Sequence, residues 1–255
     1  MGSHTATLAY ASDSHEEAGS QAVKVQLKLR EMILAGDLQA GSRITELAMV
    51  DKLGVSRTPI RSALIRLEQE GLLQQMPSGG FAIRQFSEAD VADAIELRGT
   101  VEGLAVRMAA ERGVAMDALT QASDCLDQID GLLDQSVLDE EAFSNYVRLN
   151  AQFHALLGEL SASPVLQREL ERVGSLPFAS PSGFVGVQAH TPEARDMLIV
   201  AQHQHRQVID AIAHREGARA ESVMREHSRL AQKNLRQAVH QMSNLPGVHL
   251  IRPTA

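Results

Sequence analysis

The chain has 255 residues, a net charge of −8 and an aromatic content of only 3%. This length allows one or two domains. There is no apolar run long enough to cross a bilayer and no secretory signal pattern, which argues against a membrane or exported protein. The single cysteine, Cys125, excludes an intramolecular disulfide framework and favours a reducing, cytoplasmic location.

Charge is unevenly distributed along the chain. Residues 21–86 hold nine Lys/Arg against six Asp/Glu, a net charge of +3, whereas the remainder carries −11. An acidic protein with one basic module is typical of a local DNA contact surface rather than of nonspecific nucleic-acid binding. The small and polar residues 1–19 are predicted to form a flexible tail, and residues 20–86 a DNA-binding domain.

The first predicted elements are two helices. Apolar residues recur mostly on one helical face from Val25 to Leu34, and the segment Asp37–Gly41 ends this helix. A second short helix is predicted over Ile44–Leu53. Gly54 follows it, at a position where a tight turn needs a residue that tolerates positive φ.

The next segment reads LGVSRTPIRSALIRLEQEGLL and indicates the recognition helix of a helix-turn-helix. Ser56 suits the N-cap position, and Pro59 falls in the first turn, where a missing N–H costs little. Arg57, Thr58 and Arg61 then lie near the helix N-terminus, where a recognition helix meets base edges and phosphates. The alternative interpretation is an ordinary amphipathic surface helix.

Two short β-prone runs follow and flank the sequence Pro77-Ser78-Gly79-Gly80, which is the pattern of a β-hairpin. Three helices followed by a hairpin form a winged helix-turn-helix. Its glycine tip, Gly79 and Gly80, is able to approach a sugar-phosphate backbone closely.

The rest of the chain reads as almost entirely helical. Ser87 is expected to cap a helix with an acidic first turn, and helices are predicted over residues 87–112, 116–135, 139–160, 163–173, 192–214 and 218–242. This pattern is typical of an antiparallel bundle, whose core can hold ligand and metal sites. The predicted fold is therefore mainly α: a winged helix-turn-helix, an all-α domain over residues 87–243 and a C-terminal tail over residues 244–255.

Four polar residues of the predicted bundle form a candidate metal site. Asn150 and His154 are four residues apart and so share a helix face, while His205 and His227 stand on the last two predicted helices. Three imidazoles and one oxygen could surround a divalent ion with positions left open for a ligand. Zinc or nickel would suit them. The alternative is a polar, water-filled pocket lined by the same side chains.

Arg98 is a second candidate, because it stands among apolar residues in the predicted helix IELRGTVEGLA. Gly99 and Gly103 beside it permit close approach of another helix or leave free space. A bidentate contact with a ligand carboxylate is one interpretation of this buried charge. The other is a salt bridge within the bundle to Glu102, four residues on.

Two resemblances add to these patterns. The order GDLQAGSRI, LGVSRTPIRSALIRLEQEGLL and GG, within residues 21–86, closely resembles the GntR family of bacterial transcription regulators. That resemblance implies a homodimer on a pseudo-palindromic operator, with base contacts to guanine from Arg57 or Arg61 and a phosphate contact from Arg43. The complete predicted DNA-binding set is Arg43, Ser56, Arg57, Thr58, Arg61, Gly79 and Gly80.

The segments ELRGTVEG, NAQFH, HRQVIDAI and MREH, within about residues 90–235, resemble the FCD effector domain of the FadR-like subfamily. The resemblance implies metal ligands at Asn150, His154, His205 and His227. It also implies that Arg98 holds an effector carboxylate. The complete predicted effector-binding set is Arg98, Glu102, Asn150 and Phe153, with Glu102 as a positioning partner of Arg98. Asn150 departs from the family, which more often has Asp, and a neutral amide is a weaker ligand that leaves the site more positive.

Within that subfamily the chain is most similar to the vanillate-repressor (VanR) type, through YVRLNAQFH and PFASPSGF. The implied function is a repressor released by an aromatic carboxylate such as vanillate. Phe153, Phe178 or Phe184 would stack on its ring, or alternatively would only fill the core. Non-aromatic organic or sugar acids are the alternative effectors. A metal-dependent enzyme is the rival class, but HExxH, G-x-S-x-G and Walker motifs are absent from the sequence.

Overall fold

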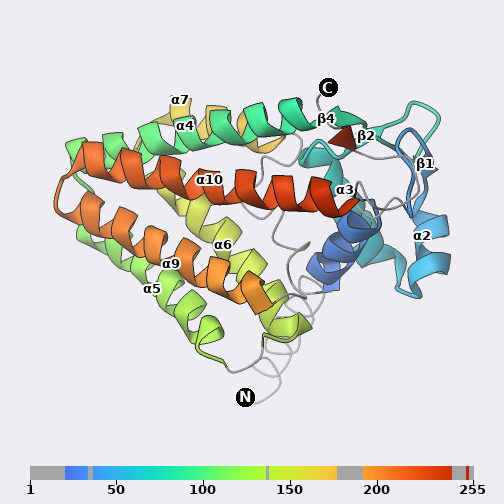
Figure 1. Cartoon of the computed structure of the whole chain (residues 1–255), viewed down its shortest axis with the longest axis horizontal. Coiled ribbons are helices and arrows are strands. Elements are labelled where there is room, and N and C mark those ends of the chain that lie inside the picture. The colour runs from blue at the N-terminus through green and yellow to red at the C-terminus, as the bar shows by residue number, and fades with distance from the viewer. Residues whose placement is uncertain (1–20, 34–36, 136–137, 177–191, 243–250, 253–255) are drawn as a thin grey trace, which may run out of the picture.

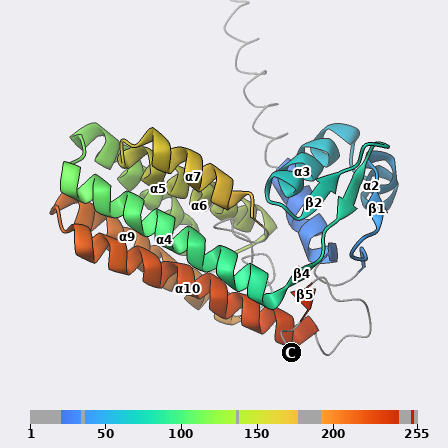
Figure 2. The ribbon, with the colours of Figure 1, turned by 90° about the horizontal axis from the view of Figure 1, so that it is seen from above.

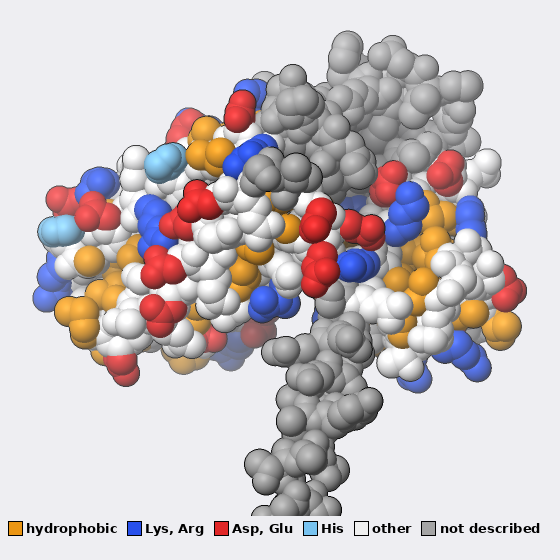
Figure 3. Space-filling view, turned by 90° about the horizontal axis from the view of Figure 1, so that it is seen from below, with side chains coloured by type: hydrophobic (Ala, Val, Ile, Leu, Met, Phe, Trp, Pro, Cys, Tyr) orange, Lys and Arg blue, Asp and Glu red, His pale blue; other side chains and the backbone are white. Residues whose placement is uncertain are grey.

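The computed structural model describes residues 21–33, 37–135, 138–176, 192–242 and 251–252. A small domain built around a three-stranded sheet lies at one end of an elongated helical bundle (Figures 1 and 2). Acidic and basic side chains alternate over the face of the bundle seen in Figure 3. No helix in the described ranges is long and apolar enough to span a membrane.

The small domain is a winged helix-turn-helix. A helix over residues 21–33 precedes β1 (Arg43–Ile44), α2 (Glu46–Leu53), α3 (Arg57–Gln69), β2 (Leu73–Gln75) and β3 (Phe81–Ile83). The strands form an antiparallel sheet in the order β1-β3-β2. Gly54 ends α2 with a φ of 66°, so the turn uses the left-handed conformation expected of this glycine.

The prediction of a helix from Ile44 is wrong. Ile44 belongs to β1, pairs with Phe81 and is only 2% exposed, which suits a β-branched side chain. The helix begins at Glu46, because the Thr45 hydroxyl accepts a hydrogen bond from the Ala48 N–H at 3.2 Å and caps it. The wing therefore has a third strand that the sequence pattern did not indicate.

The bundle contains the helices expected from the sequence, with boundaries shifted by at most two residues. They are α4 (Glu88–Arg112), α5 (Met116–Leu133), α6 (Glu140–Leu160), α7 (Pro164–Gly174), α9 (Pro192–Ala213) and α10 (Gly217–Met242). α4 and α10 run side by side (Figures 1 and 2). Gly99 of α4 lies so close to Ser228 of α10 that a Cβ would not fit between them. The mainly α fold class is confirmed.

The two domains meet at β4 (Phe86–Ser87). The Ser87 hydroxyl accepts a hydrogen bond from the Asp90 N–H at 3.0 Å, and the Asp90 carboxylate accepts one from the Ser87 N–H at 3.0 Å. This reciprocal capping box starts α4 as predicted. β5 (Ile251–Arg252), inside the segment predicted as a tail, pairs in parallel with β4.

The first turns of α4 belong to the core of the winged helix-turn-helix domain. Phe86, Val91 and Ile95 are buried in one apolar cluster with Leu64 and Leu67 of α3. Arg98 follows Ile95 by three residues, which is about 4.5 Å along a helix axis. The helix that carries Arg98 in the bundle therefore also packs directly against α3.

Candidate DNA surface, histidine cluster and cavity

The candidate DNA-binding surface lies on the exposed face of α3. Ser56, Arg57, Thr58 and Arg61 are all exposed, whereas the opposite face of α3 is buried. Ser56 occupies the N-cap position with extended backbone, but its hydroxyl makes no capping hydrogen bond. The structure thus places the predicted recognition residues together on one accessible helix end.

Glu46 is a residue of this surface that the sequence analysis missed. Its carboxylate lies 3.7 Å from both Arg57 Nη2 and Arg61 Nε, whose side chains are 68% and 70% exposed. A groove of about 430 Å³ runs between α2, α3 and the wing, and Leu47 lines it with 61% of its area exposed. Glu46 holds the two arginines over this groove.

Arg43 supports the tip of the wing. Its Nη2 donates to the carbonyl oxygens of Ser78 and Gly79 at 2.9 and 2.7 Å. Gly79 and Gly80 have φ values of +83° and +80°, a conformation that L side chains rarely adopt. A Cβ on Gly80 would also lie 2.7 Å from the Ile44 carbonyl oxygen. The tip therefore depends on both glycines and on the Arg43 side chain.

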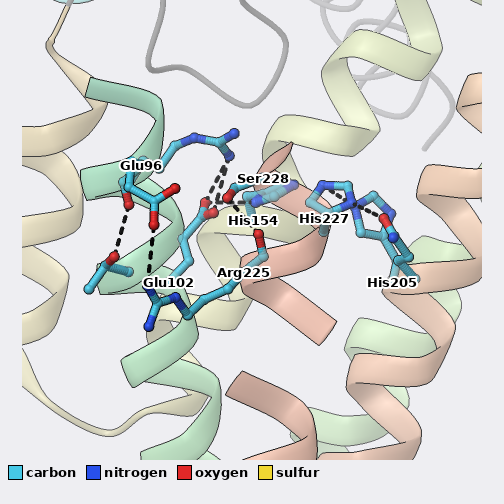
Figure 4. Close-up of polar contacts among 10 residues, drawn as sticks. Glu96, Glu102, His154, His205, Arg225, His227 and Ser228 are labelled. Carbon is cyan, nitrogen blue, oxygen red and sulfur yellow. Dashed lines mark hydrogen bonds and ion pairs between the residues drawn. The ribbon is translucent and has the colours of Figure 1, made fainter. Parts of the chain in front are cut away.

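The three predicted histidines converge from different helices. His154 of α6, His205 of α9 and His227 of α10 are buried, and one ring nitrogen of each lies within 4.8 Å of the others. His205 Nε2 is 3.2 Å from His227 Nε2 (Figure 4). Asn150 lies one turn before His154 on α6 and is 3% exposed. His203 is exposed, as expected from its different helix face.

Hydrogen bonds at Nδ1 determine which nitrogen of each imidazole carries the proton and which keeps its lone pair. Gln202 Nε2 donates to Leu126 O at 2.9 Å and Asp130 Oδ1 at 2.8 Å, so its Oε1 faces His205 Nδ1, 3.2 Å away, as an acceptor. His205 Nδ1 therefore carries the proton, and Nε2 keeps its lone pair. Neither Gln202 nor its role was predicted from the sequence.

The other two rings follow the same pattern. His154 Nδ1 lies 2.8 Å from Glu102 Oε1, and His227 Nδ1 lies 3.2 Å from Gln204 Oε1. His154 Nε2 is buried without a hydrogen-bond partner among the described residues. Three Nε2 lone pairs consequently face one another in a buried space, which is unfavourable unless a cation or a proton lies between them.

These residues fit a divalent metal ion. Bonds of 2.0–2.1 Å to a common zinc ion place two nitrogens roughly 3.0–3.4 Å apart, and His205 Nε2 and His227 Nε2 are 3.2 Å apart. Burial, together with the positive neighbourhood of His154 and Arg98, holds the pKa of His205 well below its usual range. Burial and His205 lower the pKa of His227 likewise. Both imidazoles are therefore neutral, as ligands must be.

Arg98 and Glu102 connect this cluster to α4. Arg98 Nη1 donates to Glu102 Oε2 at 3.1 Å, so the predicted salt bridge within the bundle is present. Burial tends to raise the pKa of Glu102, but the charge of Arg98 and the contact with His154 outweigh it and bring the pKa to about 2. Arg98 Nε has no hydrogen-bond partner within the described part of the chain.

A cavity of about 560 Å³ opens beside these side chains, between α4, α6 and α7. Arg98, Glu102 and His154 line it, together with Glu159 and Glu171, which the sequence analysis did not single out. Phe153 does not line it: its ring is fully buried and lies 4.6 Å from the His205 ring, centroid to centroid. Phe178 and Phe184 lie outside the described residues.

Family comparison agrees with this architecture. Residues 93–230 match the FCD domain, and residues 21–83 match the gntR family of bacterial regulatory proteins. The chain belongs to the GntR family. This is a family of bacterial regulatory proteins, so this chain is a transcription regulator and not an enzyme.

Several relatives of this GntR-family regulator are regulators themselves. The HTH-type transcriptional regulator YdhC of Bacillus subtilis is 30% identical over 177 residues, covering 69% of this chain and 75% of YdhC. An HTH-type regulator in an unstable DNA locus of Streptomyces ambofaciens is 32% identical over 212 residues, 80% of each chain. E. coli McbR/YncC shares the fold, with a TM-score of 0.54 at 20% identity over 87% of this chain and 98% of McbR.

Proposed function

We propose that this GntR-family regulator is a homodimeric repressor that a small carboxylate releases from its operator. The observation that carries the proposal is the cavity, because the buried guanidinium of Arg98 lines it beside His154 of the histidine cluster, and Arg98 Nε has no hydrogen-bond partner among the described residues. Residues 20–86 would bind DNA, and residues 87–243 would bind the effector and the second protomer.

A carboxylate is the ligand that these side chains favour. The Arg98 guanidinium offers a charge-assisted hydrogen bond, worth roughly 1.5–3 kcal/mol. A divalent ion held by His154, His205 and His227, with Asn150 as the fourth ligand, would supply Lewis acidity beside it when bound. Zinc or nickel suits the imidazoles. Asn150 adds no negative charge, so the site keeps a positive potential that attracts an anion.

Two classes of carboxylate remain as effectors. The VanR-type resemblance favours an aromatic acid such as vanillate. No Phe, Tyr or Trp stands among the described residues that line the cavity, and this observation favours the alternative, a non-aromatic organic or sugar acid. Phe153 in particular packs against His205 and offers its ring to the histidine cluster rather than to a ligand.

An exposed apolar stripe supports the homodimer. Leu97 and Leu104 are one heptad apart on α4 and remain 41% and 40% exposed in the single chain. Large apolar side chains on one helix face are what a self-complementary interface uses. A dimer would present two copies of α3 to successive major grooves of a pseudo-palindromic operator.

Fluorescence anisotropy on the chain's own upstream DNA, titrated with a panel of small acids that includes vanillate, tests the proposal. Release from DNA by one acid at micromolar concentration, lost in Arg98→Ala, supports a ligand-released repressor. A hundredfold preference of the acid for the DNA-free state corresponds to about 2.7 kcal/mol. Tight DNA binding that no acid changes would contradict the proposed effector site. It would still agree with the proposed role of residues 20–86 in binding DNA.

A further inference from the structure

The outer end of the cavity carries two carboxylates. Glu159 near the end of α6 and Glu171 on α7 both line the cavity and are exposed. Neither carboxylate forms an ion pair with a described residue. By contrast, Glu169, also on α7, is paired with Arg172 at 2.8 Å and does not line the cavity.

The inner end of the cavity favours an anion, unlike the acidic outer end. Arg98 is 3% and His154 is 6% exposed, and Arg98 Nε, which is an N–H donor, has no hydrogen-bond partner among the described residues. The Glu102 carboxylate already accepts hydrogen bonds from Arg98 and from His154 Nδ1. These contacts partly balance its negative charge, so it repels an incoming anion less strongly. A carboxylate is therefore favoured at this end and a donor of hydrogen bonds at the other.

Mostly small side chains complete the lining of the cavity. They are Ala151, Ala155, Gly158, Leu170 and Gly174, together with the amide side chain of Gln167. His154 and Glu159 are five residues apart on α6, a spacing of about 7.5 Å along the helix axis. A ligand that spans both ends needs its two polar groups roughly that far apart, with a slim apolar body between them.

We propose that the effector is a bifunctional carboxylate, with a hydroxyl or ammonium group at its far end that donates to Glu159 and Glu171. This inference rests on the proposed function, since it takes the carboxylate at Arg98 as given. It excludes dicarboxylates of the same length, because their second anion would meet two unpaired carboxylates. The far-end donor, rather than the shape of the body, is then the group by which the regulator recognises its effector.

Calorimetric titration of the full-length chain with matched acids tests this directly. One series is benzoate, 4-hydroxybenzoate, 4-(aminomethyl)benzoate and terephthalate; the other is hexanoate, 6-hydroxyhexanoate, 6-aminohexanoate and adipate. We expect the hydroxy or amino acid to bind roughly tenfold to a hundredfold more tightly than the plain acid, and the dicarboxylate to bind more weakly. The hydroxyl and ammonium arms show which donor the site prefers.

Three isosteric variants locate the effect. Glu159→Gln and Glu171→Gln should reduce the advantage of the amino acid over the plain acid by about tenfold, without weakening the plain acid. Glu169→Gln, on the same helix but outside the cavity, should change neither affinity. Because Glu159 and Glu171 are exposed and the Glu169 side chain is 45% exposed, thermal melts should show the folded state unchanged.

The outcomes separate the inference from the function on which it rests. If plain acids bind through Arg98 but a far-end donor adds nothing, or both cavity variants behave like Glu169→Gln, the bifunctional effector is wrong and the carboxylate site stands. If no acid of either series binds, and Arg98→Ala behaves like the wild type, the proposed effector site itself is overturned.

Discussion

Replacing Glu102 by leucine should leave the buried guanidinium of Arg98 without its carboxylate partner. The two side chains are 4% and 5% exposed, and Arg98 Nη1 lies 3.1 Å from Glu102 Oε2. Removing one partner of a buried ion pair costs about 3–5 kcal/mol, because the remaining charge stays in a medium of low polarity. Since Arg98 also lines the cavity, where water can reach it, we expect the lower end of that range, about 3 kcal/mol.

The same helix offers a matched control. Arg107 and Glu111 have the same spacing of four residues and lie 2.8 Å apart, but their side chains are 47% and 53% exposed. An exposed pair contributes about 0–1 kcal/mol, so Glu111→Leu should change stability by no more than that. The double variant Arg98→Met/Glu102→Leu removes both buried charges and should recover most of the loss, apart from the hydrogen bond to His154.

Urea denaturation followed by circular dichroism, on metal-free protein without effector, measures these free energies of unfolding. Metal and ligand are left out because either would add its own binding free energy to the folded state. Two results would refute the reasoning: a Glu102→Leu variant no less stable than Glu111→Leu, or a double variant as unstable as the single one. Either would mean that the guanidinium does not depend on Glu102 for its burial.

Three further predictions concern the histidines, the DNA surface and the cap of α4. His205→Ala should abolish binding of one zinc or nickel ion per chain, measured by elemental analysis after dialysis. His203→Ala, on the exposed face, should retain the ion. Equal metal content in the two variants would exclude the histidine cluster as the metal site. Arg61→Ala should weaken operator binding by about 1–3 kcal/mol in anisotropy titrations with an unchanged melting temperature, and unchanged affinity would remove Arg61 from the recognition set. Hydrogen bonds from the Ser87 side chain and backbone lower the pKa of Asp90 from its ordinary value of 3.8. The cap should therefore stabilise the fold above that pH and lose its effect as the pH falls through the lower folded-state pKa. The stability difference between wild type and Asp90→Asn should shrink on acidification, and a pH-independent difference would contradict this.

Local signals explain why the helices were predictable. Ser87, Asp139 and Ser163 each accept a backbone hydrogen bond at the start of a helix, and Gly113 and Gly217 lie where helices end or begin. These capping preferences act within four residues and are visible in sequence. The two-residue strand β1 was missed because Arg43 and Ile44 are too few to carry an alternating pattern, and only pairing with β3 defines them.

The polar contacts of the site depend on residues far apart in the chain. His154 and Glu102 are separated by 52 positions, and Gln202 is fixed by Asp130, 72 positions away. Spacing placed His154 and Asn150 on one helix face but gave no sign of the amides that orient His205 and His227. Glu159 and Glu171 were unremarked for the same reason, since exposed glutamates are common and only the cavity gives these two a shared position.

The position of Arg98 on α4 provides a short structural route from the proposed effector site to the recognition helix. Ile95, one turn earlier, is buried in the same cluster as Leu64 of the recognition helix, and Glu96 holds α10 through Arg225 at 3.2 Å (Figure 4). A carboxylate at Arg98 and a ligand at His227 would therefore act on two helices that pack side by side along their length. The effector needs only to favour one arrangement of that pair over another for α3 to change its presentation to DNA.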